Sequence, residues 1–404
     1  MSGKISYNCL LGWLGMIISP ILSLPFAIVG MIGLKKWGFV LWAFFMGLLG
    51  ILYPPTGDIY RYYIDFKTIS HISGSDFLLF LSFRFDYLLS IIEYILSRLG
   101  IPFDFYKFIY NFICYYILGI LYLKIIYHYG NKASINLRII VLLTIITFSI
   151  SNFLFRFDFS KILFIYGCYL IFFDNNKKGW LYLIISCLNH LSMTVLLVFI
   201  ILAKLKFFSF SKKILIAICI CCLLLDAQLA TSLLSFLPIN IVDRYAVYLD
   251  GYWAKDFIQD HSILFRLQRY SSIAFTYILM LIYIMIYDKK HIKYENFVNA
   301  LILVTCISSP FITVFYRFSS VLFLAVKFYF LRTFNFTKRS FNYLYIIMSL
   351  TILLNFMNLW SSRRQLSISE IYNIVLPAPC ILSFSYTDDW ISNNVFENGD
   401  FKHN

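Results

Sequence analysis

Charged side chains are scarce in this sequence. Only 13% of its 404 residues are Asp, Glu, Lys or Arg, and 61% are apolar, whereas about 25% charged residues is usual for a soluble protein. No soluble core could absorb so large an apolar share. A transmembrane helix needs roughly 20 mostly apolar residues, and such stretches recur between short lysine-bearing loops. The sequence predicts an all-α polytopic membrane protein, with residues 1–404 as a single integral membrane domain.

Several motifs of nucleotide and metal chemistry are also missing. The chain has no Walker loop, no dinucleotide glycine fingerprint and no zinc-type Cys/His spacing, so we expect no ATP-driven pump, no cofactor and no metal site. Its nine cysteines lie in apolar segments, except for Cys380, which indicates small buried hydrophobic residues rather than disulfides. The net charge is +14, but the basic residues form no continuous stripe in the sequence, so nucleic acid is not an expected partner.

About eleven spans are predicted from these apolar stretches. The first is broken by Pro20 and Pro25; it is one span or a tight hairpin, and is too long for a signal peptide. Residues 179–203 begin and end near lysines, so we expect two half-helices that meet around Asn189 and His190. The predicted spans are 9–33, 38–54, 106–126, 138–153, 159–173, 179–203, 213–230, 271–287, 296–313, 317–331 and 341–359.

The charge pattern of the loops predicts an orientation. Lysines and arginines cluster in short loops that contain only Asp174, Asp288 and Glu295 as carboxylates, and such basic loops favour the cytoplasm. The other carboxylates fall on or near the opposite side, whose larger stretches are 55–105, 231–270 and 360–404. Within the first, residues 86–99 form a re-entrant or interfacial helix with one polar stripe of Asp86, Ser90, Glu93 and Ser97. The orientation depends on how 9–33, 86–99 and 179–203 are placed.

The first candidate motif follows an early span. Pro54 and Pro55 end that span, and Thr56 or Asp58 can cap the next helix. Spacings of three and four residues then place Asp58, Arg61 and Asp65 on one face. The motif is either a helix cap with a local ion pair, or a carboxylate and a guanidinium directed at a sugar and a phosphate.

A second motif begins another apolar stretch. Arg156 and Ser160 share a helix face, and Lys161 lies further into apolar sequence. Burying such a charge unpaired costs about 2.5 to 3.5 kcal/mol even on lenient insertion scales. We therefore expect a wet cavity, or else an Asp158–Lys161 pair with Arg156 reaching to the interface.

Two further candidates are single residues in or beside apolar spans. His190 is the only histidine within a span, and an imidazole can accept a proton from an attacking hydroxyl; the alternative is a hydrogen-bonded structural histidine. Arg317 lies between two spans on the predicted outer side. It either binds an anion or anchors the chain at the interface.

The loop from 240 to 270 combines charges with many rings. Aromatic rings can stack on sugars, carboxylates bind hydroxyls, and arginines donate two parallel hydrogen bonds to phosphate oxygens. An ordinary solvated loop would carry the charges but rarely so many rings. The predicted substrate-binding residues here are Asp243, Arg244, Tyr245, Tyr248, Trp253, Arg266 and Arg269.

Taken in order, these motifs resemble a known family. The run Pro54-Pro55-Thr56-Gly57-Asp58-Ile59-Tyr60-Arg61-Tyr62, then Arg156, His190 and Tyr316-Arg317-Phe318, is similar to the bacterial O-antigen and exopolysaccharide polymerases of the Wzy and EpsG-like family. The resemblance implies a multi-pass glycosyltransferase of the bacterial inner membrane, GT-C-like in fold, with a large periplasmic loop. Asp158 and Lys161 depart from the small residues more typical there, which puts the role of Lys161 in doubt.

The resemblance also implies a reaction. Repeat units linked to undecaprenyl pyrophosphate would be joined on the periplasmic face, without a metal ion, to make an O antigen or another surface polysaccharide. A flippase and a chain-length regulator of the same pathway are expected partners, as is membrane lipid. Arg61, Arg156 and Arg317 would hold the pyrophosphate, His190 in preference to Asp58 would accept the proton, and Asp65 would bind substrate.

Two other functions remain open on the sequence alone. A flippase for the same lipid-linked oligosaccharide would also have many helices and intramembrane charges. A membrane O-acyltransferase is the third reading. The large outer loop and the lack of visible internal repeats favour the polymerase.

Overall fold

The structure is a computed structural model that describes residues 6–84, 86–145, 156–223, 263–288, 290–400 and 402. These ranges contain helices and no β-strand, which confirms the all-α prediction. Within the part of the chain that the structure describes, three helices are long and apolar enough to cross a bilayer: Phe103–Lys132, Thr313–Thr333 and Lys338–Trp360. Most of the other predicted spans correspond to apolar helices of 10–17 residues. The chain is therefore a helical membrane protein, and a count of eleven spans stays a prediction.

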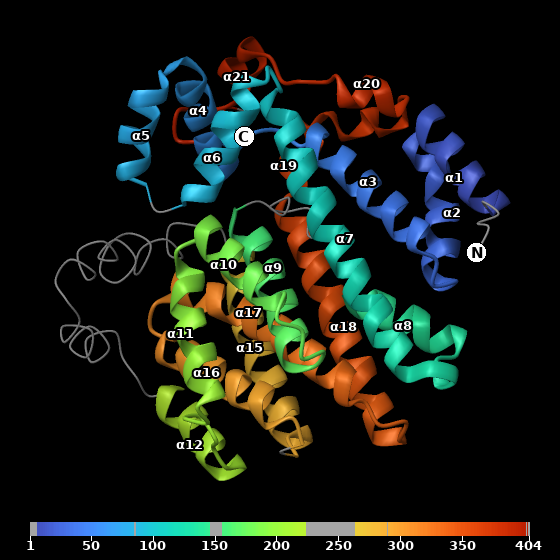
Figure 1. The fold of residues 1–404 in the computed structure, drawn as a ribbon, viewed down its shortest axis with the longest axis vertical. Coiled ribbons are helices and arrows are strands. Elements are labelled where there is room, and N and C mark those ends of the chain that lie inside the picture. Colours follow the sequence, from blue (N-terminus) through green and yellow to red (C-terminus); the bar gives the residue numbers. More distant parts are fainter. Residues whose placement is uncertain are drawn as a thin grey trace. The chain divides into compact units, whose positions relative to one another are not determined.

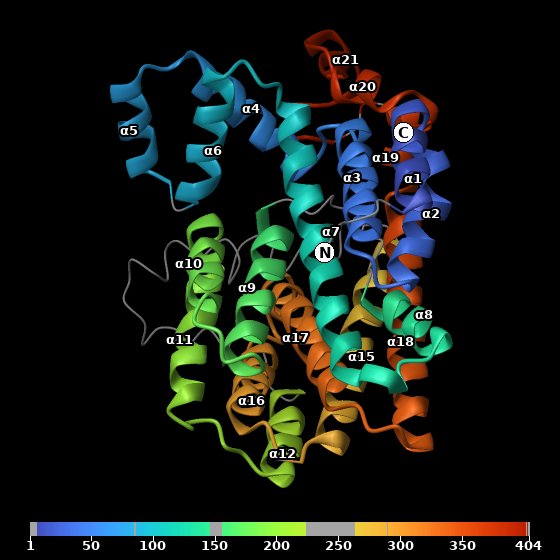
Figure 2. The same cartoon turned by 45° about the vertical axis from the view of Figure 1, so that its right-hand side comes forward.

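The chain divides into two compact units. The first comprises Met1–Tyr166, Leu181–Met193 and Asn355–Asn404, and the second Gly167–Trp180 and Thr194–Leu354. Figures 1 and 2 show the helices of each. The helices that begin in the first unit or lie in its C-terminal part are α1 Tyr7–Ile18, α2 Pro20–Ile32, α3 Lys36–Leu52, α4 Asp58–His71, α5 Gly74–Ser82, α6 Tyr87–Arg98, α7 Phe103–Tyr129, η1 Gly130–Lys132, α8 Ile135–Ile145, α9 Arg156–Phe172, α19 Arg363–Ser367, η2 Glu370–Val375, α20 Ala378–Leu382 and α21 Asp388–Asn394.

The first apolar segment is a tight hairpin of two short helices. Ser19 has an extended backbone between α1 and α2, and Pro20 occupies the first turn of α2, where its missing N–H costs nothing. A Cβ atom on Gly15 would lie 3.1 Å from the backbone of Leu22, so the two helices approach closely. Of the two predicted alternatives, the hairpin is confirmed.

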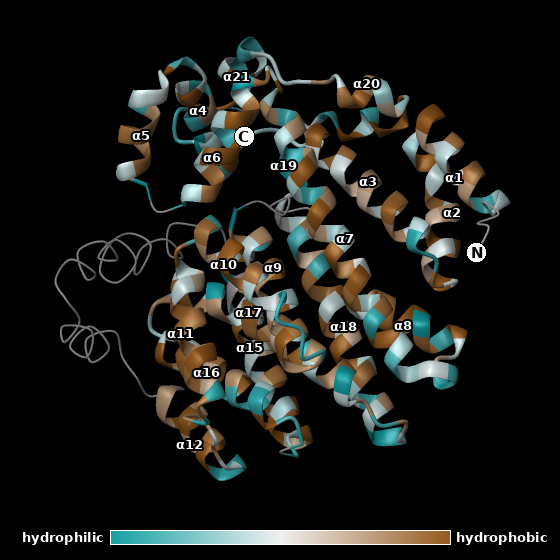
Figure 3. Ribbon diagram, viewed as in Figure 1, coloured by the Kyte–Doolittle hydropathy of each residue, from teal (hydrophilic) through white to brown (hydrophobic). Residues whose placement is uncertain are grey.

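Helices α3 and α7 form the apolar core of the first unit. A Cβ atom on Gly47 would lie 2.7 Å from the Phe108 ring, and one on Gly119 would lie 2.5 Å from the Phe39 ring. Glycine at these contacts allows the two helices to approach closely, as is common between membrane helices. Figure 3 shows hydrophobic residues along much of α3, in contrast to the hydrophilic turns of α4 and α21.

A buried ion pair lies in the first turns of α7, beside the end of α3. Lys107 Nζ lies 2.7 Å from Asp104 Oδ1, and the side chains are 0% and 6% exposed. The same ammonium donates to the carbonyl of Ile51 at 3.1 Å and to that of Tyr53. Because an unpaired charge would be costly here, this lysine is fully compensated by one carboxylate and two carbonyls.

The C-terminal segment packs against this end of the unit. The backbone N–H of Tyr386 donates to Asp104 Oδ2 at 2.9 Å, and its hydroxyl donates to the Leu52 carbonyl at 2.6 Å. Tyr386 shares a small apolar core with Ile391 and Val395, against which Tyr60 and Tyr63 of α4 pack. The predicted outer stretches 55–105 and 360–404 are thus in contact with each other.

The beginning of α4 differs from the prediction. Neither Thr56 nor Asp58 caps the helix through its side chain; Gly57, with φ of 56°, is the N-cap residue. Its backbone N–H donates to the Gly399 carbonyl at 2.9 Å. Glycine suits this left-handed conformation, and the C-terminal segment supplies the hydrogen bond to this loop.

The segment 55–105 contains α4, α5, α6 and the first residues of α7. The helix expected from Thr56 or Asp58 is α4, the one expected over 86–99 is α6, and α5 was not predicted. Helix α6 has the predicted polar stripe, but Ser90 and Glu93 on that stripe are buried, and α6 contacts α4 and α7. Burial raises the pKa of Glu93 well above its usual value. The stripe therefore faces the protein interior.

The second unit has its own buried polar network. Its helices are α10 Gly179–Asn189, which passes into the first unit, α11 Ser192–Lys204, which begins there, α12 Lys212–Leu223, α15 Ile263–Ile286, α16 Ile292–Ile307, α17 Ile312–Thr333 and α18 Lys338–Ser361, which ends in the first unit. Tyr329 donates to Glu295 Oε1 at 2.7 Å, and Tyr283 donates to Asn299 Oδ1 at 2.9 Å. These bonds join α15, α16 and α17. The part of the predicted loop 231–270 that precedes Ile263 lies outside the described residues.

Candidate functional site

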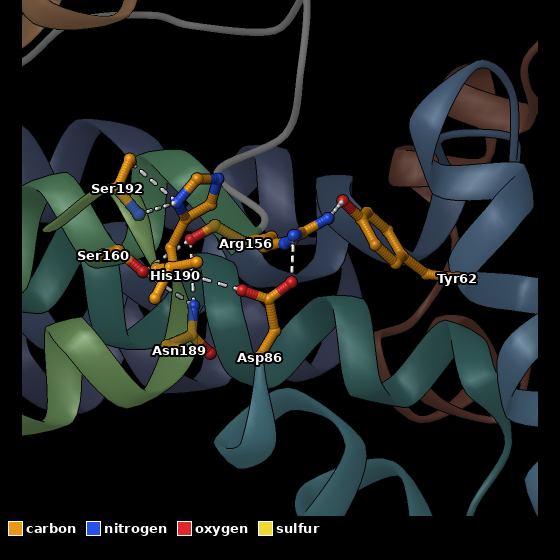
Figure 4. Close-up of polar contacts among 8 residues, drawn as sticks. Tyr62, Asp86, Arg156, Ser160, Asn189, His190 and Ser192 are labelled. Atoms are coloured by element: carbon orange, nitrogen blue, oxygen red, sulfur yellow. Dashed lines mark hydrogen bonds and ion pairs between the residues drawn. The ribbon is translucent and has the colours of Figure 1, made fainter. Parts of the chain in front are cut away.

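Arg156 is the centre of a polar cluster in the first unit. It is the first residue of α9, and its Nη2 forms an ion pair with Asp86 Oδ2. Its Nη1 donates to the Tyr62 hydroxyl at 3.0 Å. Figure 4 shows the guanidinium between the phenol of Tyr62, on α4, and the carboxylate of Asp86, in the loop before α6. Three segments far apart in the sequence therefore meet at one arginine.

The guanidinium retains donors for a ligand. The Arg156 side chain is 32% exposed, compared with 13% for Asp86. A guanidinium has five N–H groups, and the two described contacts use one on each Nη. The Nε atom is buried without a partner among the described residues. One further N–H on each Nη can donate to an anionic oxygen while the other holds the side chain in place.

Burial and charge set the protonation of this cluster. Burial raises the pKa of Asp86, although Arg156 acts in the opposite direction. Burial also raises the pKa of the Tyr62 phenol to about 12. The pKa of Arg156 would be lowered by burial alone, but Tyr62 and Asp86 raise it overall. The guanidinium therefore remains a permanent positive charge.

A second set of hydrogen bonds fixes the first turn of α9. Asn189, the last residue of α10, donates through Nδ2 to the Arg156 carbonyl and to Ser160 Oγ, both at 2.9 Å. Its Oδ1 accepts from the Tyr110 hydroxyl at 3.0 Å. Ser186 donates to the Ser160 carbonyl at 2.7 Å. The backbone that carries Arg156 is therefore held by side chains of α7 and α10.

His190 lies in the predicted helix break, which the structure confirms. Helix α10 ends at Asn189 and α11 begins at Ser192. His190 Nδ1 accepts the backbone N–H of Ser192 at 3.2 Å and lies 2.8 Å from Ser192 Oγ. Asp86 Oδ1 accepts the N–H of Leu191 at 3.4 Å. The break is held by side chains, and Asp86 connects it to Arg156.

The two aspartates of α4, Asp58 and Asp65, belong to different ion pairs. Asp58 lies 3.6 Å from Arg61, and both side chains are mostly exposed. Asp65 Oδ1 instead pairs with Arg84 Nη2 at 2.5 Å. Asp58 lies one turn before Tyr62 on α4, and its carboxylate contributes to raising the pKa of Arg156, so it is close to the Arg156 cluster. Asp65 is not available in the same way, since its carboxylate is occupied.

The remaining predicted site residues lie elsewhere. Arg317 is in the second turn of α17, not between two spans as predicted, and it belongs to the second unit. Arg266 and Arg269 belong to α15, which begins at Ile263 and not at 271, and Arg266 is exposed. The others lie outside the described residues: Asp243, Arg244, Tyr245, Tyr248 and Trp253.

Lys161 has a local partner. Its Nζ forms an ion pair with Asp158 Oδ1, as the structural alternative predicted. The other half of that alternative, Arg156 reaching to the interface, stays a prediction; the structure shows Arg156 paired with Asp86. Asp86, Tyr62, Ser160 and Asn189 were not predicted as site residues from the sequence. The available signal was Asp86 at the head of a polar stripe, since an arginine beside apolar sequence needs a carboxylate.

The other reactive side chains show no second cluster. Within the described residues, no three His, Cys, Asp or Glu side chains lie close enough to hold a metal ion. The nine cysteines all lie among the described residues and none forms a disulfide; Cys221 and Cys380 are exposed, and Cys9 and Cys187 are half-buried. The expectation that every cysteine except Cys380 is buried is therefore wrong for Cys221.

Comparison with known protein families shows which family the chain belongs to. A family model described as the EpsG family matches residues 35–375. The chain belongs to the EpsG family. The matched region of this EpsG protein contains the whole Arg156 cluster, from Tyr62 to Ser192. Membership indicates a membrane protein with a polysaccharide polymerase-like role. No curated protein and no solved structure matches the chain.

Proposed function

We propose that the protein is a glycosyltransferase that polymerises a surface polysaccharide from undecaprenyl-pyrophosphate-linked repeat units, on the periplasmic face of the bacterial inner membrane. One observation carries the proposal: in an EpsG-family chain, Arg156 is held by Asp86 and Tyr62 while two of its N–H groups stay open. A fixed guanidinium with two open donors suits the oxygens of a pyrophosphate.

In the proposed reaction, a hydroxyl of the acceptor repeat unit attacks the anomeric carbon of the donor. A new glycosidic C–O bond forms, the bond between the anomeric carbon and the pyrophosphate oxygen breaks, and undecaprenyl pyrophosphate leaves with the electron pair. Negative charge grows on the leaving oxygen, where preorganised donors have their largest effect. Arg156 supplies such donors, and Arg61 on the exposed turn of α4 supplies a second guanidinium.

The hydroxyl proton needs an acceptor. Of the two proposed bases, the geometry favours Asp58 over His190. Because His190 Nδ1 accepts the Ser192 N–H, the neutral ring carries its proton on Nε2 and has no free lone pair there. Asp58 is an exposed carboxylate one turn from Tyr62. We therefore assign His190 to the positioning of the α10–α11 break.

Variants at His190 separate these two roles. Asparagine can cap a helix as well as any residue, so His190→Asn should retain polymer within a few-fold of wild type. His190→Ala leaves the Ser192 N–H without its acceptor and should destabilise the protein by about 1 kcal/mol. Polymer length on gels and thermal unfolding of the purified protein are the two measurements. Loss of polymer in both variants, with normal unfolding, would restore His190 as the base.

Deletion of the gene tests the function itself. We expect cells that carry a single repeat unit on each lipid anchor, with long chains restored by the wild-type gene. Complete absence of repeat units would indicate a flippase instead. Full-length chains that lack acyl groups would indicate an O-acyltransferase. Gel profiling of the surface polysaccharide distinguishes all three results.

A further inference from the structure

The second unit contains a polar pocket that is separate from the Arg156 cluster. Its volume is about 130 Å³. Three segments contribute its polar residues: the turn between α9 and α10, the end of α11 and the beginning of α16. The polar residues and the ring that line it are Asn175, Asn176, Lys177, Trp180, Lys204 and Lys293.

The turn that forms one wall of this pocket is rigidly built. The backbone N–H of Asn176 donates to the Leu170 carbonyl at 2.8 Å, and its Oδ1 accepts the N–H of Lys178 at 3.0 Å. Asn175 has φ of 51°, a conformation that asparagine tolerates better than most residues. A Cβ atom on Gly179 would lie 2.5 Å from the Gly167 carbonyl. The turn is therefore packed tightly onto α9, and its wall is formed before a ligand arrives.

All the charged side chains that line the pocket are positive. Lys177, Lys204 and Lys293 line it, and no carboxylate does. None of the three has an ion pair among the described residues. Lys204 Nζ lies 4.7 Å from the centroid of the Trp180 ring, which holds this ammonium at the rim by a cation–π contact. Three like charges around one cavity repel each other unless an anion lies between them.

The volume of the pocket and its place in the chain limit which ligands it can bind. A cavity that holds one water molecule needs a volume of about 10 to 15 Å³. The volume of this pocket, about 130 Å³, is therefore large enough for a tetrahedral phosphate group with its oxygens. Lys177 lies in a turn, Lys204 ends α11 and Lys293 lies in the first turn of α16. All three belong to the basic clusters whose charge predicts the cytoplasmic side. Phospholipid phosphates lie at the depth where transmembrane helices end, and tryptophan is enriched there.

We propose that this pocket binds a phosphate monoester or diester, with Lys177, Lys204 and Lys293 as its ligands and Trp180 at its edge. The phosphate belongs either to the headgroup of an anionic phospholipid or to a soluble phosphate compound. The site is independent of the polymerase reaction, because none of its residues takes part in the Arg156 cluster.

The test compares two triple variants of the full-length protein in lipid nanodiscs. The first is Lys177→Gln, Lys204→Gln and Lys293→Gln. The matched control is Lys178→Gln, Lys206→Gln and Lys213→Gln, which removes three lysines from neighbouring positions that do not line the pocket. Native mass spectrometry measures phosphatidylglycerol retained over phosphatidylcholine. Each basic residue near an anionic lipid strengthens binding roughly fivefold, so the first variant should bind roughly a hundredfold more weakly, and the control should match wild type.

Inorganic phosphate separates the two sources. Retention of phosphatidylglycerol that excess phosphate does not displace assigns the site to a lipid headgroup. A rise in the unfolding temperature on adding phosphate in pure phosphatidylcholine discs, lost in the first variant only, assigns it to a soluble phosphate. Equal binding of both probes by the two triple variants overturns the proposal. Should the first variant not fold, each single substitution replaces it, with an expected loss of roughly fivefold.

Discussion

Arg156→Lys is expected to lower the formation of long polysaccharide chains by at least about a hundredfold, the usual effect of removing one preorganised donor from a developing charge. Lysine retains the positive charge but has a compact ammonium in place of the planar fork. It cannot contact Asp86 and Tyr62 and also offer two open N–H groups to a pyrophosphate. The measurement is polymer length and yield in a deletion strain that carries the variant gene.

A matched control for this substitution lies in the same unit. Arg84 also pairs with an aspartate, Asp65, but this pair is more exposed, at 41% and 24%. Exposed ion pairs contribute little, so Arg84→Lys should keep polymer close to wild type. Wild-type chains from Arg156→Lys, at equal protein level, would show that the guanidinium fork has no role in the reaction.

Asp104→Ala is expected to destabilise the protein by about 3 to 5 kcal/mol, because it leaves a buried ammonium without its carboxylate. Lys107 is fully buried and would keep only the carbonyls of Ile51 and Tyr53. The backbone N–H of Tyr386 would also lose its acceptor. Thermal unfolding of the purified protein measures the loss, and limited proteolysis should show earlier cleavage within residues 363–400.

Two variants check the cause of that loss. Asp388→Ala removes another aspartate of the same contact region, one that pairs with Lys67 at 2.6 Å but is 67% exposed; its effect should be small. Lys67, and after it Tyr63, hold the pKa of Asp388 below its usual value. The double variant Asp104→Leu with Lys107→Met should recover most of the stability, since it removes both buried charges. An unrecovered double variant would mean that Asp104 acts through Tyr386 alone.

The sequence predicted the class of the fold better than its details. Apolar stretches and lysine-bearing loops were sufficient to predict a helical membrane protein, whereas Pro20 and Pro25 left one span and a tight hairpin as alternatives for the first apolar segment. The helix break at Asn189 and His190 was predicted because lysines at both ends of 179–203 place both ends on the same side of the membrane, which a single straight span does not allow. The pattern of apolar and charged residues could not predict contacts between distant segments. In the sequence Lys107 is a single charge near the start of an apolar stretch with Asp104 three residues before it, and only the structure shows Ile51 and Tyr386 beside it.

The candidate site was only partly predicted, because it too depends on contacts between distant segments. Arg156 and His190 were identified because charges and imidazoles are rare in apolar sequence. Their partners were not, since Asp86 and Tyr62 lie in stretches with many other polar and aromatic residues. Spacing along α4 correctly placed Asp58 near Arg61, but it could not show that Asp65 pairs with Arg84.

The docking of the C-terminal segment onto α3 and α4 has a consequence for biogenesis. The hydroxyl of Tyr386 meets the carbonyl of Leu52 across 334 positions of sequence, and Gly399 completes the loop at Gly57. During translation, residues 52–57 leave the ribosome long before either partner is made. The helix that carries Tyr62 therefore lacks its final contacts while the intervening helices are being inserted. Only a chain that has been translated past Gly399 can complete this end of the protein, so prematurely terminated products would lack the contacts of Tyr386 with Leu52 and of Gly399 with Gly57.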